Sequence, residues 1–493
     1  MTNRLLLVSL LAACASARYS ESAMTAGAAP QQQIAGEPVT SGEDYHDNGK
    51  NPWVDASKDH LSTFAADVDT ASYAIARRKL QGGELPPAAS VRVEEWVNYF
   101  KYGFPATTAD TAPFSVVMDA AAHPFEPNRY VLRVGVATKE KTAGERKPAS
   151  LVFLVDVSGS MDSADKIELA KKSLHILTQN LTDKDSVALV TYAGDSRIVL
   201  PMTGVDHRAL IDKAIDSLHV GGSTAMASGI DLAYEQAIKT VRPGAISRVI
   251  VCTDGDANVG AHSHEEMLQL IEARAKAGVT LSTIGFGMGN YKDALMEQLA
   301  DKGNGNNYYI DSFEMAKRVF AEQLTSTLEV AAKDVKLQVD FDPARVSRYR
   351  LIGYENRDLK DSDFRKDDVA AGQVGWGHQV TAMYEVELVA DAPLSPLGLV
   401  RIRHKQPEAD AAVETAFAMA SAPAADFAHA SPDLQFAFAV AAFADVMRGG
   451  ATWSLEDIRA LANTNAFSSE RKELVSLIDK AMALRGKDAT VAR

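Results

Sequence analysis

The chain has 493 residues and a 46% hydrophobic content, enough for about three folded domains at roughly 150 residues each. Its formal net charge of -14 argues against a nucleic-acid-binding protein, because binding to phosphates depends on clustered Lys and Arg side chains. We therefore expect no nucleic acid among its partners. An acidic chain of this kind is compatible with divalent cations at particular sites.

The first residues of the chain have the pattern of a bacterial secretion signal. Arg4 is followed by the apolar run 5–11, which is too short to span a membrane. The small residues before Cys14 make residues 11–14 similar to the lipoprotein cleavage box, and this resemblance implies that Cys14 is lipidated and begins the mature protein. Ala15, a residue other than Asp, then implies an outer-membrane anchor facing the periplasm. Residues 1–14 are thus expected to be the lipoprotein signal peptide and cleavage box, and the alternative is a chance cysteine in a general signal peptide.

A flexible tether and a small mixed region are expected next. Residues 15–50 are rich in Ala, Ser, Gly and Gln, so they cannot bury enough apolar surface to fold. Residues 51–148 carry helix and strand patterns and predict an N-terminal α+β region. Its expected helices are 70–80 and 91–100, and its expected strands are 114–120 and 130–138.

Residues 149–330 alternate regularly between apolar strand patterns and helix patterns. The first strand is expected at 151–157 and the last helix at 315–328. Alternation at this spacing predicts an α/β domain, in which helices cover both faces of a doubly wound, mostly parallel sheet. The predicted fold class is therefore α/β, flanked by a β-rich region and helical segments.

Residues 331–493 are expected to form a C-terminal domain that is first β-rich and then helical. Strand patterns thus lie on both sides of the α/β domain. We hypothesise that this domain is inserted into one β-rich module, whose strands come from 114–138 and 335–403. The strands predicted after the α/β domain are 335–341, 350–354, 380–389 and 399–403, and the helices are 433–447, 455–462 and 471–484.

Several conspicuous residues have a structural explanation. Cys252 lies in an apolar run, and with the first cysteine acylated the mature chain has no second thiol for a disulfide. We therefore expect Cys252 to be a small buried hydrophobic residue. Four aromatic side chains are expected in the core of a small domain rather than on a binding surface: Trp96, Tyr99, Phe100 and Phe104.

Polar residues after two predicted strands mark a candidate metal site. Asp156, Ser158 and Ser160 close the first strand of the α/β domain, and Asp254 closes a second apolar run. A glycine-rich loop that contains Thr224 leads into a helix. Ligands of open α/β sheets bind at the carboxyl ends of the strands, so we expect these residues to meet at one edge. Their oxygen atoms are ligands of the kind that Mg²⁺, Mn²⁺ or Ca²⁺ prefers.

In their order and spacing, these residues resemble the complete metal-ion-dependent adhesion site of a von Willebrand factor type A domain, over about residues 150–326. The resemblance implies that the three hydroxyls bind the ion directly and that the two carboxylates act mainly through bound water. It also implies that an Asp or Glu of a partner protein takes the open coordination position. The flanking regions resemble those of bacterial lipoproteins with a type A domain. The expected function is a membrane-anchored, non-enzymatic module that captures an acidic residue of a partner through Mg²⁺.

Two other functions remain open. A phosphatase of the haloacid dehalogenase type also begins its motif with an aspartate after an apolar strand, but it needs a second acid where this chain has Ser158. An envelope assembly or scaffold lipoprotein would act mainly through the flanking domains. If replacement of Asp156 by Ala left partner capture unchanged, the scaffold would be favoured.

Individual site residues also have simpler explanations. Ser158, Ser160 and Ser163 precede a helix and can cap it. Asp254 precedes a glycine and can form a turn. Three more polar residues are candidates for a larger site, although a loop and a helix start explain them better: Asp256, His262 and His264.

Overall fold

The computed structural model describes residues 45–66, 69–105, 113–142, 144–222, 226–255, 264–287, 292–369 and 371–491. Cys14, Thr224, Asp256 and His262 lie outside the described residues, as does most of the predicted tether. The end of that segment, 45–50, is described and contacts the folded protein, since the Lys50 ammonium donates a hydrogen bond to the carbonyl of Gly449.

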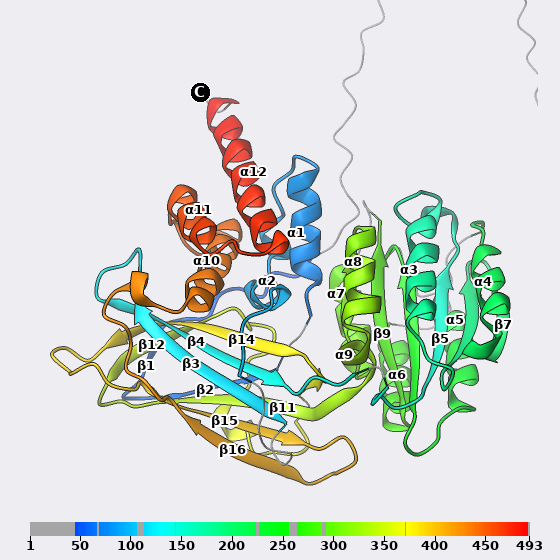
Figure 1. Ribbon diagram of the computed structural model, residues 1–493, viewed down its shortest axis with the longest axis horizontal. Helices are drawn as coiled ribbons and strands as arrows, with labels where there is room; N and C mark the ends of the chain where they lie inside the picture. Colours follow the sequence, from blue (N-terminus) through cyan, green and yellow to red (C-terminus); the bar gives the residue numbers. More distant parts are fainter. Residues whose placement is uncertain are drawn as a thin grey trace, which may run out of the picture. The chain divides into compact units, whose positions relative to one another are not determined.

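The α/β domain contains one six-stranded sheet. Its strands are β5 (Ala149–Asp156), β6 (Ser186–Tyr192), β7 (Ser196–Gly204), β8 (Ile246–Thr253), β9 (Val279–Phe286) and β10 (Asn307–Ile310). Their order in the sheet is β10-β9-β8-β5-β6-β7. The labelled strands β9, β5 and β7 follow one another from left to right in Figure 1. Neighbouring strands are parallel except β6 and β7, which are antiparallel. The predicted mostly parallel sheet of an α/β fold is therefore confirmed.

Helices cover both faces of this sheet. The main ones are α3 (Ile167–Gln179), α4 (Arg208–Asp216), α5 (Met226–Ile238), α6 (His264–Lys276) and α7 (Asp293–Lys302). Along β5, Leu151 and Phe153 belong to one buried cluster that includes side chains of α3. Val152 and Leu154, which point to the other face, belong to a second cluster with side chains of α5 and α6. A strand buried on both faces explains the unbroken apolar run in the sequence.

The last helical segment of the domain is interrupted. The sequence predicts one helix at 315–328, but the structure has α8 (Phe313–Lys317) and α9 (Leu324–Leu328), separated by a π-helical turn at Arg318–Glu322. In this turn the Arg318 guanidinium lies over the ring of Tyr99, 4.0 Å from its centroid. A single π turn hardly changes the apolar spacing, so the sequence pattern does not reveal it.

Strands from both sides of the α/β domain form one antiparallel sheet. They are β1 (Val54–Asp55), β3 (Phe114–Ala122), β4 (Arg129–Thr138), β12 (Val346–Ile352) and β14 (Gln379–Leu388). The order is β1-β12-β14-β4-β3, so that β4, before the domain, pairs with β14, after it. This pairing confirms the hypothesis that the α/β domain is inserted into a β-rich module.

A second antiparallel sheet completes this module. Its strands are β2 (Leu61–Ala65), β11 (Val330–Phe341), β13 (Gly372–Gly375), β15 (Gly398–Lys405) and β16 (Ala412–Ala418). Phe64 of β2, Leu337 of β11 and Tyr384 of β14 belong to one buried cluster, so the two sheets share a core. The sequence analysis did not predict β1, β2, β13 and β16. These segments are short or partly exposed, and their strand conformation depends on pairing with distant partners.

Five helices flank the first of these sheets: α1 (Ala71–Gln81), α2 (Val93–Tyr99), α10 (Pro432–Met447), α11 (Leu455–Thr464) and α12 (Ser469–Val491) (Figure 1). The rings of Trp96 in α2 and Phe443 in α10 meet edge to face with centroids 5.3 Å apart. Trp96, Tyr99 and Phe100 are buried and Phe104 packs against the same cluster, which confirms that these aromatic residues form core. Among the described residues, no helix is long and apolar enough to cross a membrane.

Candidate metal site

Asp156 and Asp254 lie at the same edge of the parallel sheet. Asp156 ends β5, Asp254 follows β8, and these two strands are parallel neighbours with Val155 opposite Cys252. Both aspartates are buried, with 0% and 1% of their surfaces exposed. Cys252 is a free, buried thiol, as expected, and burial raises its pKa to about 12.

The Asp156 carboxylate accepts hydrogen bonds on both oxygens. The amide of Ser158 donates to Oδ1 over 2.9 Å, and the hydroxyl of Thr253 donates to Oδ2 over 3.1 Å. Burial raises the pKa of Asp156 in spite of these hydrogen bonds, and the nearby Asp254 carboxylate adds to the rise. Two buried carboxylates repel each other when both are ionised, so the arrangement favours a positive charge beside them.

The hydroxyls of Ser158 and Ser160 converge just beyond Asp156. Their Oγ atoms are 3.0 Å apart. The helix that follows, α3, has Lys166 at its N-cap, and among the described residues no side-chain hydrogen bond caps it. Ser163 donates instead to the carboxylate of Asp165 over 2.6 Å. The capping explanation of these serines is therefore wrong, and the two hydroxyls face each other.

Gly222 joins the glycine-rich loop to the loop of the serines. The amide of Gly159 donates to the carbonyl of Gly222 over 3.1 Å, and the amide of Gly221 donates to the carbonyl of Val157 over 2.8 Å. Gly222 has a φ of 93°, a conformation that favours glycine. The loop therefore reaches the serines, whereas the place of Thr224 beyond it stays a prediction.

Lys166 brings an ammonium group to the site, which the sequence analysis did not predict. Its Nζ donates to Oδ2 of Asp254 over 2.9 Å and to the carbonyl of Ser160 over 2.9 Å. The lysine side chain is 11% exposed and that of Asp254 is 0% exposed, so the ion pair is largely buried. In the sequence this lysine resembles any polar residue before a helix, and only the tertiary structure brings it to Asp254.

The described residues of the site fit a hard divalent cation. Two carboxylates and two hydroxyls gather at one edge, and an all-oxygen set of donors suits Mg²⁺, Mn²⁺ or Ca²⁺. Within the described ranges, no group of three or more His, Cys, Asp or Glu side chains is arranged to hold a metal, and this site does not depend on such a group. At the start of α6, Nε2 of His264 lies 2.9 Å from the side-chain oxygen Oε1 of Gln298, within hydrogen-bond distance.

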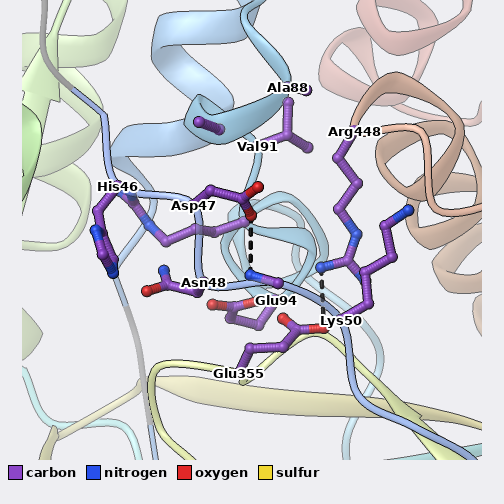
Figure 2. A pocket seen from close by; sticks show the side chains of 12 residues that line it. His46, Asp47, Asn48, Lys50, Ala88, Val91, Glu94, Glu355 and Arg448 are labelled. Carbon is purple, nitrogen blue, oxygen red and sulfur yellow. Dashed lines mark hydrogen bonds and ion pairs between the residues drawn. The ribbon is translucent and has the colours of Figure 1, made fainter.

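A separate hollow lies in the flanking region (Figure 2). It has a volume of about 160 Å³, and none of the described site residues lines it. Several of its polar groups bind one another: Arg448 pairs with Glu355 over 2.9 Å, and Asp47 accepts a hydrogen bond from the amide of Gly49 over 2.8 Å. We assign no ligand to this hollow.

Family models match most of the folded chain. The von Willebrand factor type A domain matches residues 150–322, the C-terminal region of the YfbK protein matches 326–396 and 390–484, and a model described as von Willebrand factor matches 39–133. YfbK of Escherichia coli is 38% identical over 431 residues, which cover 82% of this chain and 74% of YfbK. The chain belongs to the YfbK family.

Other similar proteins have lower sequence identity. An uncharacterised protein of Synechocystis is 27% identical over 212 residues, covering 43% of this chain and 49% of that protein. A solved von Willebrand factor type A structure from Catenulispora acidiphila is 19% identical, with a TM-score of 0.42, and the match covers 79% of this chain and 89% of that one. The type A domain matched at residues 150–322 is typically a metal-dependent protein-interaction module.

Proposed function

We propose that the protein is a cell-envelope module that binds Mg²⁺ at the edge of its α/β sheet and, through it, an acidic side chain of a partner protein. Asp156, Ser158, Ser160 and Asp254 would hold the ion together with Thr224. When bound, the ion would supply an electrophilic position that a carboxylate of the partner can fill, and Mn²⁺ or Ca²⁺ could take its place.

One observation carries this proposal. The Oγ atoms of Ser158 and Ser160 are 3.0 Å apart, at the same strand end as the buried carboxylate of Asp156. Because hydroxyl ligands are neutral, the direct ligands would not neutralise a divalent ion, and its open coordination position would attract an anionic group although the two nearby carboxylates balance its charge. A hydrolase of the haloacid dehalogenase type would need an acid at position 158, so the set of donors favours binding over phosphate chemistry.

Titration of the full-length protein with Mn²⁺ tests the site. By isothermal titration calorimetry, we expect the wild type to bind Mn²⁺ and Asp156→Ala to bind it at least about tenfold more weakly, because a buried carboxylate is lost. Ser163→Ala is the matched control, since the hydroxyl of Ser163 bonds to Asp165 and it should bind like the wild type. Equal binding by the wild type and Asp156→Ala would contradict the proposal.

Capture of a carboxylate tests the second half of the proposal. Poly-L-glutamate serves as the probe, passed over immobilised wild-type protein with Mg²⁺ or with a chelator. We expect retention with Mg²⁺, release by the chelator, and no retention by Asp156→Ala. If the chelator left retention unchanged, the metal would not bridge the protein and the carboxylates of poly-L-glutamate.

A lipid at Cys14 would anchor this module to the outer membrane on its periplasmic side. The support is the resemblance of residues 11–14 to a lipoprotein cleavage box. Cys14→Ser should move the protein from the membrane fraction of its host to the soluble periplasmic fraction. If the variant stayed in the membrane fraction, the lipid anchor would be refuted.

A scaffold function is the second candidate. It is favoured by the pairing of β4 with β14 and by a YfbK-specific C-terminal region beyond the type A domain. On this alternative, the flanking module would hold the partner and the metal would be dispensable. Crosslinking of envelope partners to the wild type and to Asp156→Ala would then give the same products, with and without chelator.

A further inference from the structure

Lys166 is a charged neighbour of the proposed cation site that cannot be a ligand. Its ammonium lies 2.9 Å from Oδ2 of Asp254 and 2.9 Å from the carbonyl oxygen of Ser160. An ammonium group has donors only and no lone pair for a metal. The lysine therefore influences the site through its charge and through the position in which it holds Asp254.

The position of Lys166 is fixed by its surroundings. The stem of the side chain lies against Gly287, where a Cβ would overlap Cγ of Lys166. The carbonyl of Gly287 accepts hydrogen bonds from Nη1 of Arg78, over 2.9 Å, and from the hydroxyl of Tyr309. Since Arg78 belongs to α1 of the flanking region, that region supports the turn on which the lysine lies.

The charge of the lysine decides the net charge of the loaded site. The carboxylates of Asp156 and Asp254 together balance one divalent cation. Among the described side chains of the site, Lys166 therefore adds one positive charge to a cation that these two carboxylates balance. Like charges a few ångströms apart repel in a poorly hydrated place, so the ammonium also weakens cation binding.

We propose that Lys166 is a positioning and specificity-determining residue, which makes the loaded site more positive. Its charge favours an anionic partner and lowers the affinity of the site for the cation itself. This inference rests on the proposed function. It predicts that the Lys166 side chain has opposite effects on cation binding and on carboxylate capture. Removal of its charge should strengthen cation binding and weaken the capture of carboxylates, because electrostatic complementarity with an acidic partner is lost.

Lys166→Met tests this in the full-length protein, because it keeps the apolar stem and removes the charge. We expect Mn²⁺ to bind about tenfold more tightly by calorimetry, and poly-L-glutamate to bind about tenfold more weakly at saturating Mn²⁺. Lys166→Arg, which keeps the charge, should stay near the wild type in both measurements. If Lys166 had a merely structural role, its removal would weaken both Mn²⁺ binding and poly-L-glutamate binding.

The outcomes separate the inference from the function on which it rests. If the wild type bound no Mn²⁺, the proposed function would fail. If the wild type bound Mn²⁺ and folded Lys166→Met bound it equally or more weakly, the role of Lys166 would be refuted. Thermal melting in chelator establishes that the variants are folded. Lys166→Gln, which is neutral but can still donate to Ser160, gives the same two readouts should Lys166→Met not fold.

Discussion

The amide of Lys147 donates a hydrogen bond of 2.9 Å to the carboxylate of Glu329, so the chain enters and leaves the α/β domain at one point. The same carboxylate pairs with the ammonium of Lys141 over 2.7 Å. Glu329 is buried, and β11 of the β-rich module begins at the next residue, Val330. Glu329 thus joins the two ends of the insertion to each other and to the module.

Replacement of Glu329 by Gln should lower the free energy of unfolding by about 1–3 kcal/mol, because a charged acceptor of buried hydrogen bonds becomes neutral. Urea denaturation, followed by circular dichroism, measures the change. Glu145→Gln is the control: Glu145 is exposed and accepts hydrogen bonds from Thr142, so its replacement should change stability much less than Glu329→Gln does. Equal effects of the two variants would show that the junction is not a stabilising contact.

Two neighbouring glycines should respond differently to replacement by alanine. Gly222 has a φ of 93°, and a Cβ there would lie 3.1 Å from the amide nitrogen of Gly194, whereas a Cβ at Gly221 meets nothing within 4 Å. We expect Gly222→Ala to move the loop away from Gly159 and to weaken Mn²⁺ binding about tenfold, and Gly221→Ala to change it little. Calorimetry measures the Mn²⁺ affinity of both variants. Similar affinities would show that the loop does not contribute to the site.

Arg78 should stabilise the contact between α1 and the α/β domain. Its guanidinium donates to the carbonyl of Gly287 and lies over the ring of Tyr309, 5.1 Å from the centroid. Arg78→Met leaves that buried carbonyl with one donor fewer and should cost about 1–3 kcal/mol in chemical denaturation. Lys79→Met, on the same helix, loses an ion pair with exposed Glu84 and should cost at most about 1 kcal/mol. A smaller loss in Arg78→Met than in Lys79→Met would contradict this role.

His123 should make the protein less stable in acid. Its Nδ1 accepts hydrogen bonds from the amides of Phe125 and Glu126, over 3.0 and 2.9 Å. Burial, assisted by the charges of Arg129 and Arg350, lowers its pKa from 6.5 to about 3. Below pH 6.5 the unfolded chain therefore binds a proton that the folded protein does not bind, and stability falls as the pH falls toward 3.

The variant His123→Asn isolates this contribution, since asparagine offers an acceptor but does not titrate. Between pH 6.5 and pH 4, the wild type should lose up to about 1.4 kcal/mol per pH unit more than the variant. Above pH 6.5 the free energies of unfolding of the wild type and the variant should depend on pH in the same way. Urea denaturation at a series of pH values gives both slopes, and equal slopes below pH 6.5 would mean that His123 titrates normally in the folded protein.

Much of the fold follows from local patterns. The apolar run that ends at Asp156 is buried on both faces, so its strand and the parallel sheet were predictable from neighbouring residues alone. The order of Asp156, Ser158 and Ser160 likewise predicted that their oxygens would gather at a strand end, as they do. Spacing within a few residues is enough for such predictions, because the backbone conformation of a strand and its turn fixes where those side chains point.

Contacts between residues far apart in the chain were decided by the tertiary structure. The strand β2 exists because β11 pairs with it, and β16 because β15 does, although neither segment has a strong strand pattern. Nothing near Lys166 in the sequence predicts that its ammonium meets Asp254. The sequence by itself determined the α/β domain and the gathering of Asp156, Ser158 and Ser160 at a strand end. The charge beside that site depends on the packing of a helix start against another strand, which local patterns do not contain.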